Sequence, residues 1–237
     1  MELSIALGLA LALFVLGQWL TRRAAHRHRH TLSQLQCATL QRALELLPAV
    51  QKHRGLGAQQ DIASVSQRNA LARELDQLWL NWPGESLQLA PLHQDWPQLR
   101  RKPADFEAHC QMIEALLIVI EQLEDRLRLT HKPQLQGLAA ACHTLEDLAR
   151  LRGLAVRAAN YRRCPAGLKM QMHLLCQRLQ HADQPEQLNS LLLRLQNDLI
   201  DAPEVRLAPS DCFALLSPPI EEHLLRLHMS FAEQLAL

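Results

Sequence analysis

The sequence predicts an all-α protein, an elongated helical bundle preceded by one N-terminal transmembrane helix. Leu, Ala, Gln and Arg, which favour helices, dominate the 237 residues, whereas the aromatic residues that favour strands make up only 4%. Apolar residues recur three and four positions apart over several long segments, as they do on one face of a helix. Residues 3–20 form an apolar run without a charged side chain, and its length is near the lower limit for crossing a bilayer.

Residues 1–21 are therefore predicted to be a membrane anchor, and residues 22–30 a basic juxtamembrane segment. Trp19 lies near the end of the apolar run, where an interfacial aromatic residue is expected. Because the basic residues follow the run, the positive-inside rule predicts a single-pass protein of the inner membrane whose main domain is cytoplasmic. A cleaved signal peptide is the alternative, but its basic residues would precede the run. The arginines of the juxtamembrane segment are Arg22, Arg23, Arg27 and Arg29.

The juxtamembrane segment also contains His26 and His30, an i,i+4 pair that a helix could present to a metal ion. The arginines beside and between these histidines would repel a cation. We therefore expect the segment to lie against anionic lipid headgroups rather than to bind a metal.

The bundle domain, residues 31–237, is divided by prolines into helical segments with Leu, Ile or Val at spacings of three and four. Two proline-rich stretches, 81–103 and 201–219, are predicted to be long connections. Trp82 and Trp96 are expected to hold the first of them on the bundle. The predicted helices are 31–60, 62–80, 104–129, 134–162, 166–181, 185–200 and 220 to near the C-terminus.

A short basic turn occurs twice at a fixed distance along the chain. The segments Arg54–Leu56 and Arg152–Leu154 both read Arg-Gly-Leu and align at an offset of 98 residues (152 − 54 = 98). Apolar positions around the two turns align at the same offset. A fixed offset of this kind indicates an internal duplication, with one copy over about 31–130 and the other over about 131–235.

The repeated arginines predict an anion-binding site. Arg54 and Arg152 each offer a planar fork of donors that fits nitrate or a carboxylate, and Lys52 and Arg150 would add positive charge. We expect Lys52 and Arg54, which follow a bend at Pro48, to point into the bundle toward another basic residue. The glycine beside each arginine would let facing helices approach closely. The alternative is that these are surface arginines beside ordinary helix-packing glycines.

Residues 48–58 resemble the start of the bacterial nitrate- and nitrite-sensing (NIT) domain. Members of that family have a motif similar to Q-[KR]-E-R-G-[LM]-[ST]-[AS] near the end of a first long helix. The resemblance implies paired helical bundles with basic residues lining an anion site, most directly Lys52 and Arg54 here and, more weakly, Arg152. This sequence departs from the motif at His53, where the family has an acid, and at Gly57, where it has Ser or Thr. The matching residues are Gln51, Lys52, Arg54, Gly55, Leu56 and Ala58.

Several other classes of function are disfavoured. The net charge of +1 gives no basic footprint for nucleic acid. The sequence has no Gly-rich phosphate loop, nucleophile elbow or HExxH motif, so no catalytic residue, metal or cofactor is predicted and the protein is not expected to be an enzyme. The six cysteines have no CxxC spacing and are predicted to be reduced thiols. They are Cys37, Cys110, Cys142, Cys164, Cys176 and Cys212.

The sequence thus predicts a membrane-anchored sensor domain that binds a small oxyanion, nitrate or nitrite, and signals to a separate output protein. A homodimer is compatible with this prediction. The main alternative is a membrane-anchored scaffold with an NIT-like bundle that binds no ligand. A third and weaker alternative is a phosphotransfer or enzymatic role, since residues 131–137 faintly resemble the phosphoacceptor helix of histidine phosphotransfer domains.

Overall fold

The structure is a computed structural model. It describes the backbone of residues 2–57, 59, 61–80, 82–129, 135–181 and 186–236. It describes the side chains of the same residues except those of residues 2–13, 181 and 232–236. The histidine at position 131, on which the phosphotransfer alternative depends, lies outside the described residues.

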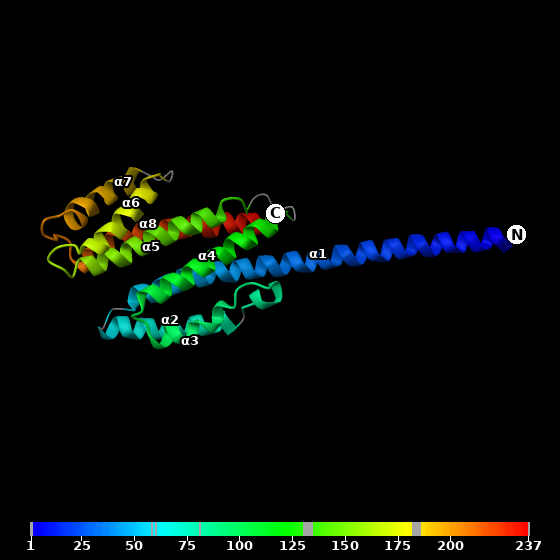
Figure 1. The fold of residues 1–237 in the computed structure, drawn as a ribbon, viewed down its shortest axis with the longest axis horizontal. Coiled ribbons are helices and arrows are strands. Elements are labelled where there is room, and N and C mark those ends of the chain that lie inside the picture. The colour runs from blue at the N-terminus through cyan, green and yellow to red at the C-terminus, as the bar shows by residue number, and fades with distance from the viewer. Residues whose placement is uncertain are drawn as a thin grey trace.

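The first helix, α1 (Glu2–Leu56), is one uninterrupted element that joins the predicted anchor, the juxtamembrane segment and the first bundle helix. It continues through Pro48 without a break in the helix. Side chains 14–32 are all exposed, and among the described side chains that of Gln36 is the first to be buried. Figure 1 accordingly shows the N-terminal part of α1 projecting alone from a bundle that contains only its C-terminal part.

The rest of the first half agrees closely with the predicted elements. Helix α2 (Ile62–Leu80) has the predicted bounds, and α4 (Phe106–Leu129) begins two residues inside the predicted helix. The connection between them carries the short turns η1 (Gly84–Leu87) and η2 (Leu92–Gln94) and the short helix α3 (Trp96–Arg101). It packs on the bundle as expected, since Trp82 and Trp96 are buried and the Trp96 indole donates to Asp76 Oδ1 at 2.8 Å.

The second half consists of α5 (Leu138–Ala158), α6 (Ala166–His181), α7 (Glu186–Leu195), the π-helical turn η4 (Gln196–Ile200) and α8 (Pro209–Ala236). The predicted connection 201–219 is wrong in its second part, because α8 begins at Pro209 and includes Pro218 and Pro219. The prolines remove two backbone donors. Helix formation prevails because Cys212, Leu216 and Ile220, spaced four residues apart, bury one continuous face.

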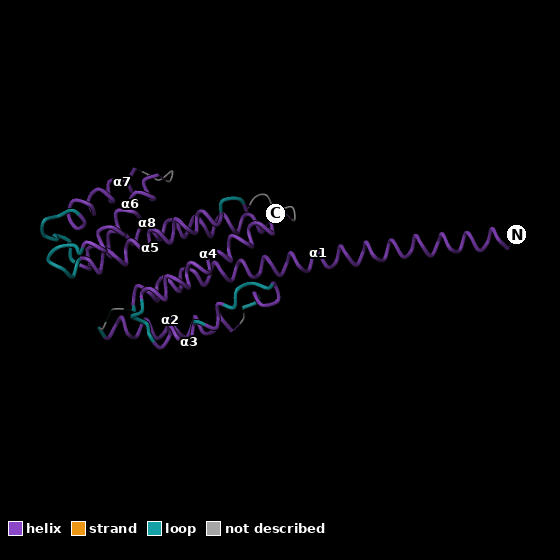
Figure 2. Tube along the Cα trace, in the orientation of Figure 1, coloured by secondary structure: helices purple, strands orange, loops and turns teal. Residues whose placement is uncertain are grey.

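The helices are arranged in layers. Helices α1 and α4 pack against each other, with α2 and α3 on one side and α5 and α8 on the other, and α6 and α7 lie outermost (Figure 1). The Cα trace in Figure 2 shows helices and loops and, over the described residues, no strand. The all-α bundle predicted from the sequence is therefore confirmed. In each half the first helix packs against the second and the last, which is the pattern that a duplication would produce.

Among the residues that the structure describes, no helix combines the length and the apolar character needed to cross a membrane. The predicted span, residues 3–20, lies largely where side chains are not described, since those of residues 2–13 fall outside the described part. The transmembrane anchor is therefore not supported by the structure. It stays a prediction from the sequence.

Two glycines at the end of α1 predict opposite responses to alanine. A Cβ atom at Gly57 would collide with the backbone carbonyl of Pro103, whereas one at Gly55 would meet nothing within 4 Å. We expect Gly57→Ala to lower the free energy of unfolding by about 1–3 kcal/mol, as overpacking does. We expect Gly55→Ala to raise it by about 0.5–1 kcal/mol through better helix propensity. Urea denaturation followed by circular dichroism measures both, and equal effects would contradict the packing described.

Candidate anion-binding site

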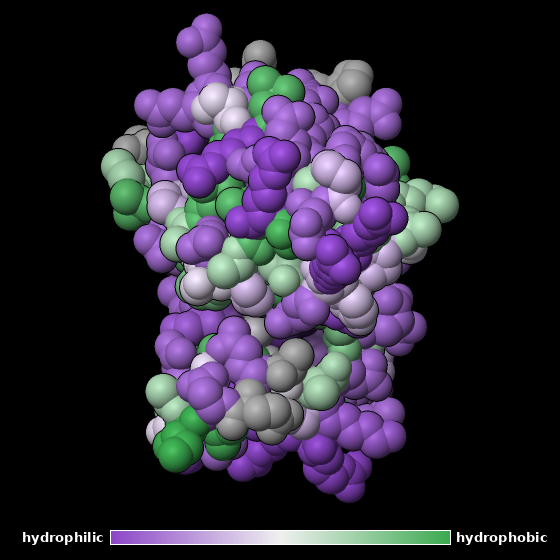
Figure 3. Space-filling model, turned by 90° about the vertical axis from the view of Figure 1, so that its left-hand side faces the viewer, coloured by the Kyte–Doolittle hydropathy of each residue, from purple (hydrophilic) through white to green (hydrophobic). Residues whose placement is uncertain are grey.

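The two Arg-Gly turns line one cavity of about 640 Å³. It is bounded by the C-terminal ends of α1 and α5 and by the N-terminal ends of α2, α4 and α8. These ends lie at the extremity of the bundle farthest from the N-terminus, which faces the viewer in Figure 3 and is mostly hydrophilic. Exposed lining residues such as Asn160 and Ser210 indicate that the cavity opens to solvent. The two turns therefore meet in space at this cavity.

Arg54 points into the bundle, but its partner is an acid rather than another base. Its guanidinium group binds the Glu146 carboxylate through two parallel hydrogen bonds of 2.6 and 3.0 Å, and the pair is almost fully buried. Gln51 Nε2 donates to the same carboxylate at 3.0 Å, and Arg54 also donates to Cys110 Sγ at 3.3 Å. Burial opposes the charged form of Arg54, but the charge and hydrogen bonds of Glu146 outweigh it and raise the pKa.

Arg152 is half-buried on the other side of the cavity. It stacks over the Phe213 ring at 4.7 Å from the centroid and donates to Ser217 Oγ at 3.1 Å. Burial and then the charge of Arg54 lower its pKa, while the charge of Glu221 acts in the opposite direction. Within the described residues no carboxylate forms an ion pair with Arg152. The charged form of Arg152 therefore has an unfavourable free energy in this environment, and a bound anion would make it less unfavourable.

Phe106, at the start of α4, connects the two turns. The Cζ atom of Arg54 lies 5.2 Å from the centroid of the Phe106 ring, and that of Arg157 lies 5.1 Å from it. A Cβ atom at Gly153 would come within 3.1 Å of this ring, so glycine there allows Phe106 to approach α5. Gly55 has no such neighbour, and its missing side chain leaves the cavity open instead. The expectation that glycine permits close packing is therefore confirmed for Gly153 and wrong for Gly55.

Two of the four predicted site residues lie elsewhere. Lys52 is exposed and does not line the cavity, because it occupies the solvent side of α1, two positions before the inward-facing Arg54. Arg150 is partly buried and pairs with Glu114 of α4 at 3.1 Å. The cavity contains Arg54 and Arg152 as predicted, together with Arg157, which is exposed and has no ion pair among the described residues.

His53, the residue before Arg54, is buried against a second histidine. His109 Nδ1 donates to the Asp105 carbonyl at 2.6 Å, so its Nε2 accepts from His53 Nδ1 at 2.8 Å when both rings are neutral. Burial first, and then the charges of His109 and Arg68, lower the pKa of His53 to about 4. Burial also lowers the pKa of His109. Position 53 thus adds packing and hydrogen bonding, and no charge, to the region beside Arg54 at neutral pH.

Glu146 and the two phenylalanines are the parts of the site that sequence reasoning missed. Glu146 carried one detectable signal, since it shares a helical face with Cys142, Ala149 and Gly153, where a charged residue is unexpected. Phe106 and Phe213 could not be identified from the sequence, because their approach to the arginines depends on how α4 and α8 pack against α5.

The net charge of the site is positive by one unit. Arg54 is neutralised by Glu146, and Asp61 lines the cavity as the one further acid, leaving Arg152 and Arg157 to give the surplus. The Asp61 carboxylate also accepts the backbone N–H of Ser64 at 2.9 Å and so caps the start of α2. A monovalent anion would balance the charge of such a site.

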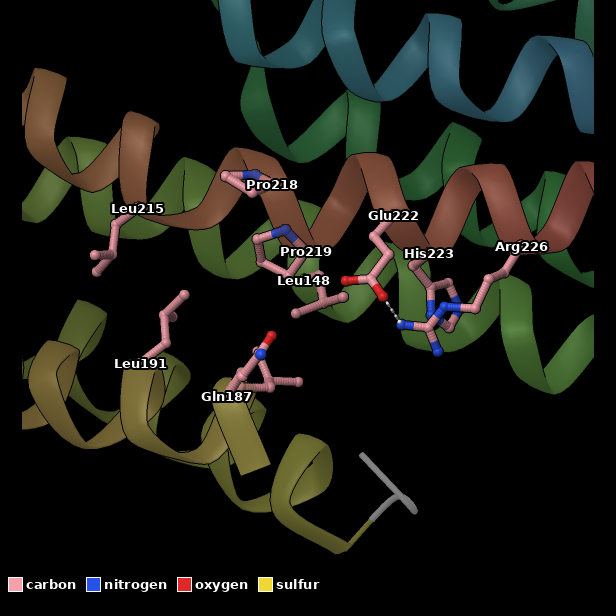
Figure 4. Close-up of a pocket in the computed structure, with 10 residues that line it drawn as sticks. Leu148, Gln187, Leu191, Leu215, Pro218, Pro219, Glu222, His223 and Arg226 are labelled. Carbon is pink, nitrogen blue, oxygen red and sulfur yellow. Dashed lines mark ion pairs between the residues drawn. The ribbon is translucent and has the colours of Figure 1, made fainter. Parts of the chain in front are cut away.

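A second cavity of about 220 Å³ lies between α5, α7 and α8 (Figure 4). Leu191 and Leu215 lie on opposite sides of it, and the ion pair of Glu222 with Arg226, at 2.9 Å, closes one end. Over the described residues no group of three or more His, Cys, Asp or Glu side chains is placed to hold a metal ion. The described cysteines are all free thiols.

Comparison with protein-family models, with curated proteins and with solved structures finds no match.

The buried Arg54–Glu146 pair predicts a non-additive mutational response. We expect Glu146→Leu to lower the free energy of unfolding by about 3–5 kcal/mol, because it leaves the Arg54 charge buried without a partner. The double variant Arg54→Met/Glu146→Leu should recover most of this loss. Glu204→Leu, which removes the exposed partner of Arg162, is the control and should cost less than about 1 kcal/mol. Urea denaturation measures each, and an additive double variant would show that the two residues are not coupled.

Proposed function

We propose that this chain is a membrane-anchored sensor-type domain that binds a small oxyanion, with nitrate or nitrite as the ligand implied by its resemblance to NIT domains. The observation that carries the proposal is the meeting of the two Arg-Gly turns at one cavity, where Arg152 and Arg157 have no ion pair within the described residues. Nitrate is planar and monovalent, so it suits both the guanidinium fork and the surplus of one positive charge.

The proposed site differs from the one predicted from the sequence in how its arginines act. Arg152 and Arg157 contact the anion. Arg54 is engaged by Glu146, so it contributes by holding α1 and α5 together and by lowering the pKa of Arg152 through its charge. Lys52 and Arg150 take no direct part.

A change at the site would reach a partner through α8. Arg152 contacts both Phe213 and Ser217, which lie one turn apart and just before Pro218 and Pro219. An anion that draws the guanidinium of Arg152 toward the cavity would weaken these contacts and displace the first part of α8. Because two prolines remove hydrogen bonds at this point of the helix, that part moves more easily than an unbroken helix would. The ligand thus favours one arrangement of α8 over another.

The alternative function is a scaffold that binds no anion. The observation that favours it is Glu146, which already neutralises the only fully buried arginine of the cavity. In this case the Arg-Gly turns hold two halves of a bundle together, and the surface of the bundle binds a protein partner. Both functions share the proposed anchor, which is supported by the uncharged apolar sequence of residues 3–20 and by the basic residues that follow it.

Anion binding predicts a selective gain in thermal stability. At a nitrate concentration of 100 times Kd, a binder should gain about 2.7 kcal/mol of unfolding free energy. We expect nitrate or nitrite to raise Tm in the wild-type protein and to have no effect on Arg152→Gln. Lys52→Gln is the matched control, because it removes one positive charge from the same region outside the cavity.

Differential scanning fluorimetry at constant ionic strength, with chloride and sulfate as reference salts, measures these shifts. A shift that survives in Arg152→Gln would place binding elsewhere. No shift with nitrate or nitrite at millimolar concentration would leave the scaffold as the function.

The proposed anchor predicts a single-pass topology with the C-terminus in the cytoplasm. Alkaline phosphatase, fused after the C-terminus, should be inactive, and the protein should sediment with the membrane fraction. The variant Leu11→Arg/Phe14→Arg should move to the soluble fraction, because each arginine at the centre of a span costs about 2.5–3.5 kcal/mol. Phosphatase activity would show that the C-terminus lies outside the cytoplasm. A wild-type protein in the soluble fraction would show that residues 1–21 are not a membrane anchor.

A further inference from the structure

The cavity at the Arg-Gly turns is much larger than nitrate requires. Its volume is about 640 Å³, which falls among the roughly 300–1,000 Å³ of sites that bind organic molecules. A water molecule occupies about 30 Å³ of liquid volume, and an anion of four heavy atoms is only a few times larger. Nitrate at Arg152 and Arg157 would therefore leave most of the cavity filled with water.

The walls of the cavity are not those of a site for a bare inorganic ion. Phe213 is 43% exposed although it lines the cavity. The partly buried Val156 adds aliphatic surface, Leu56 and Ala149 line the cavity but are buried, and Gly55 presents no side chain at all. Covering this apolar surface would favour a ligand with an apolar body, because burial of apolar area contributes about 25 cal/mol per Å².

The polar groups of the cavity are divided between two regions. The arginines Arg152 and Arg157 come from α5, whereas the neutral donors and acceptors of Gln59, Ser64 and Gln67 come from the start of α2 and the turn before it. The charge surplus of one unit, with Asp61 at the rim, suits a monoanion and opposes a doubly charged phosphate. The lining of the described cavity thus combines two arginines of α5, apolar side chains, and a polar group at the start of α2 that includes Asp61.

We propose that the ligand of this cavity is an organic monocarboxylate with a compact or flat apolar body. Its carboxylate binds the guanidinium groups of Arg152 and Arg157, and its body lies against Phe213 and over Gly55. This inference rests on the proposed anion site and names its ligand class. Nitrate then occupies only the part of the cavity beside these two arginines, where it takes the place of the carboxylate of the larger ligand.

Isothermal titration calorimetry of the full-length protein tests this inference with three sodium salts: benzoate, acetate and nitrate. We expect benzoate to bind at least about tenfold more tightly than acetate or nitrate, because the ring adds buried apolar area to the same carboxylate contact. Arg152→Gln should abolish the binding of all three. Competition between benzoate and nitrate should be complete, since both need the same arginines.

A second pair of variants tests the contacts of the ligand's apolar body separately from those of its carboxylate. Gly55→Leu places a side chain in open space within the cavity. It should weaken the affinity for benzoate at least about tenfold while changing the affinity for nitrate less than about threefold. Gly167→Leu is the matched control, because Gly167 also has nothing within 4 Å of its Cβ position but lies on α6, outside the cavity. Circular dichroism establishes that both variants are folded.

The outcomes distinguish this inference from the function on which it rests. If the affinity for nitrate equals or exceeds that for benzoate, the proposal of an organic ligand is overturned and the oxyanion sensor remains. Equal benzoate affinity in wild type and a folded Gly55→Leu also overturns it. No binding of any of the three salts overturns both proposals together.

Discussion

One buried ion pair joins the two halves of the fold. Arg54 ends the first helix of one half and Glu146 lies on the first helix of the other, and two hydrogen bonds join them with almost no exposure to water. Removing two charges from water is costly, so the geometry must be maintained by everything around it. Gln51, Cys110 and Phe106 provide this support by hydrogen bonding or stacking. The position of α1 relative to α5, and with it the shape of the cavity, follows from this pair.

The same pair explains why the second Arg-Gly turn differs from the first. Only one of the two arginines has a carboxylate partner, so Arg152 is left near a like charge and has its pKa lowered by burial and by Arg54. The two Arg-Gly turns thus differ in their contacts, since Arg54 is engaged by Glu146 and Arg152 is not, although both line the cavity. The acid beside Arg54 is Glu146 from another helix, while His53 hydrogen-bonds to His109.

Most of the fold could be predicted from the sequence because apolar spacing and proline positions are local signals. The bounds of α2 and α6 agree with the predicted helices. The failure at α8 has a physical reason: Pro218 and Pro219 normally end a helix, but tertiary burial of Cys212 and Leu216 outweighs the lost hydrogen bonds. The site was predicted only in part. The sequence indicated which arginines are unusual, but the partner and the direction of each depend on how helices distant in the chain pack together.

The continuity of α1 has a mechanical consequence. Its 55 residues, at about 1.5 Å each, make a rod on the order of 80 Å long that ends at the cavity and begins at the proposed anchor. A hydrogen-bonded helix resists bending and twisting, so a rotation at one end arrives at the other with little loss. Pro48 is the one point within the rod where a backbone hydrogen bond is missing. The stiffness of the connection between anchor and cavity is therefore set at a single residue, about 1.7 turns from Arg54.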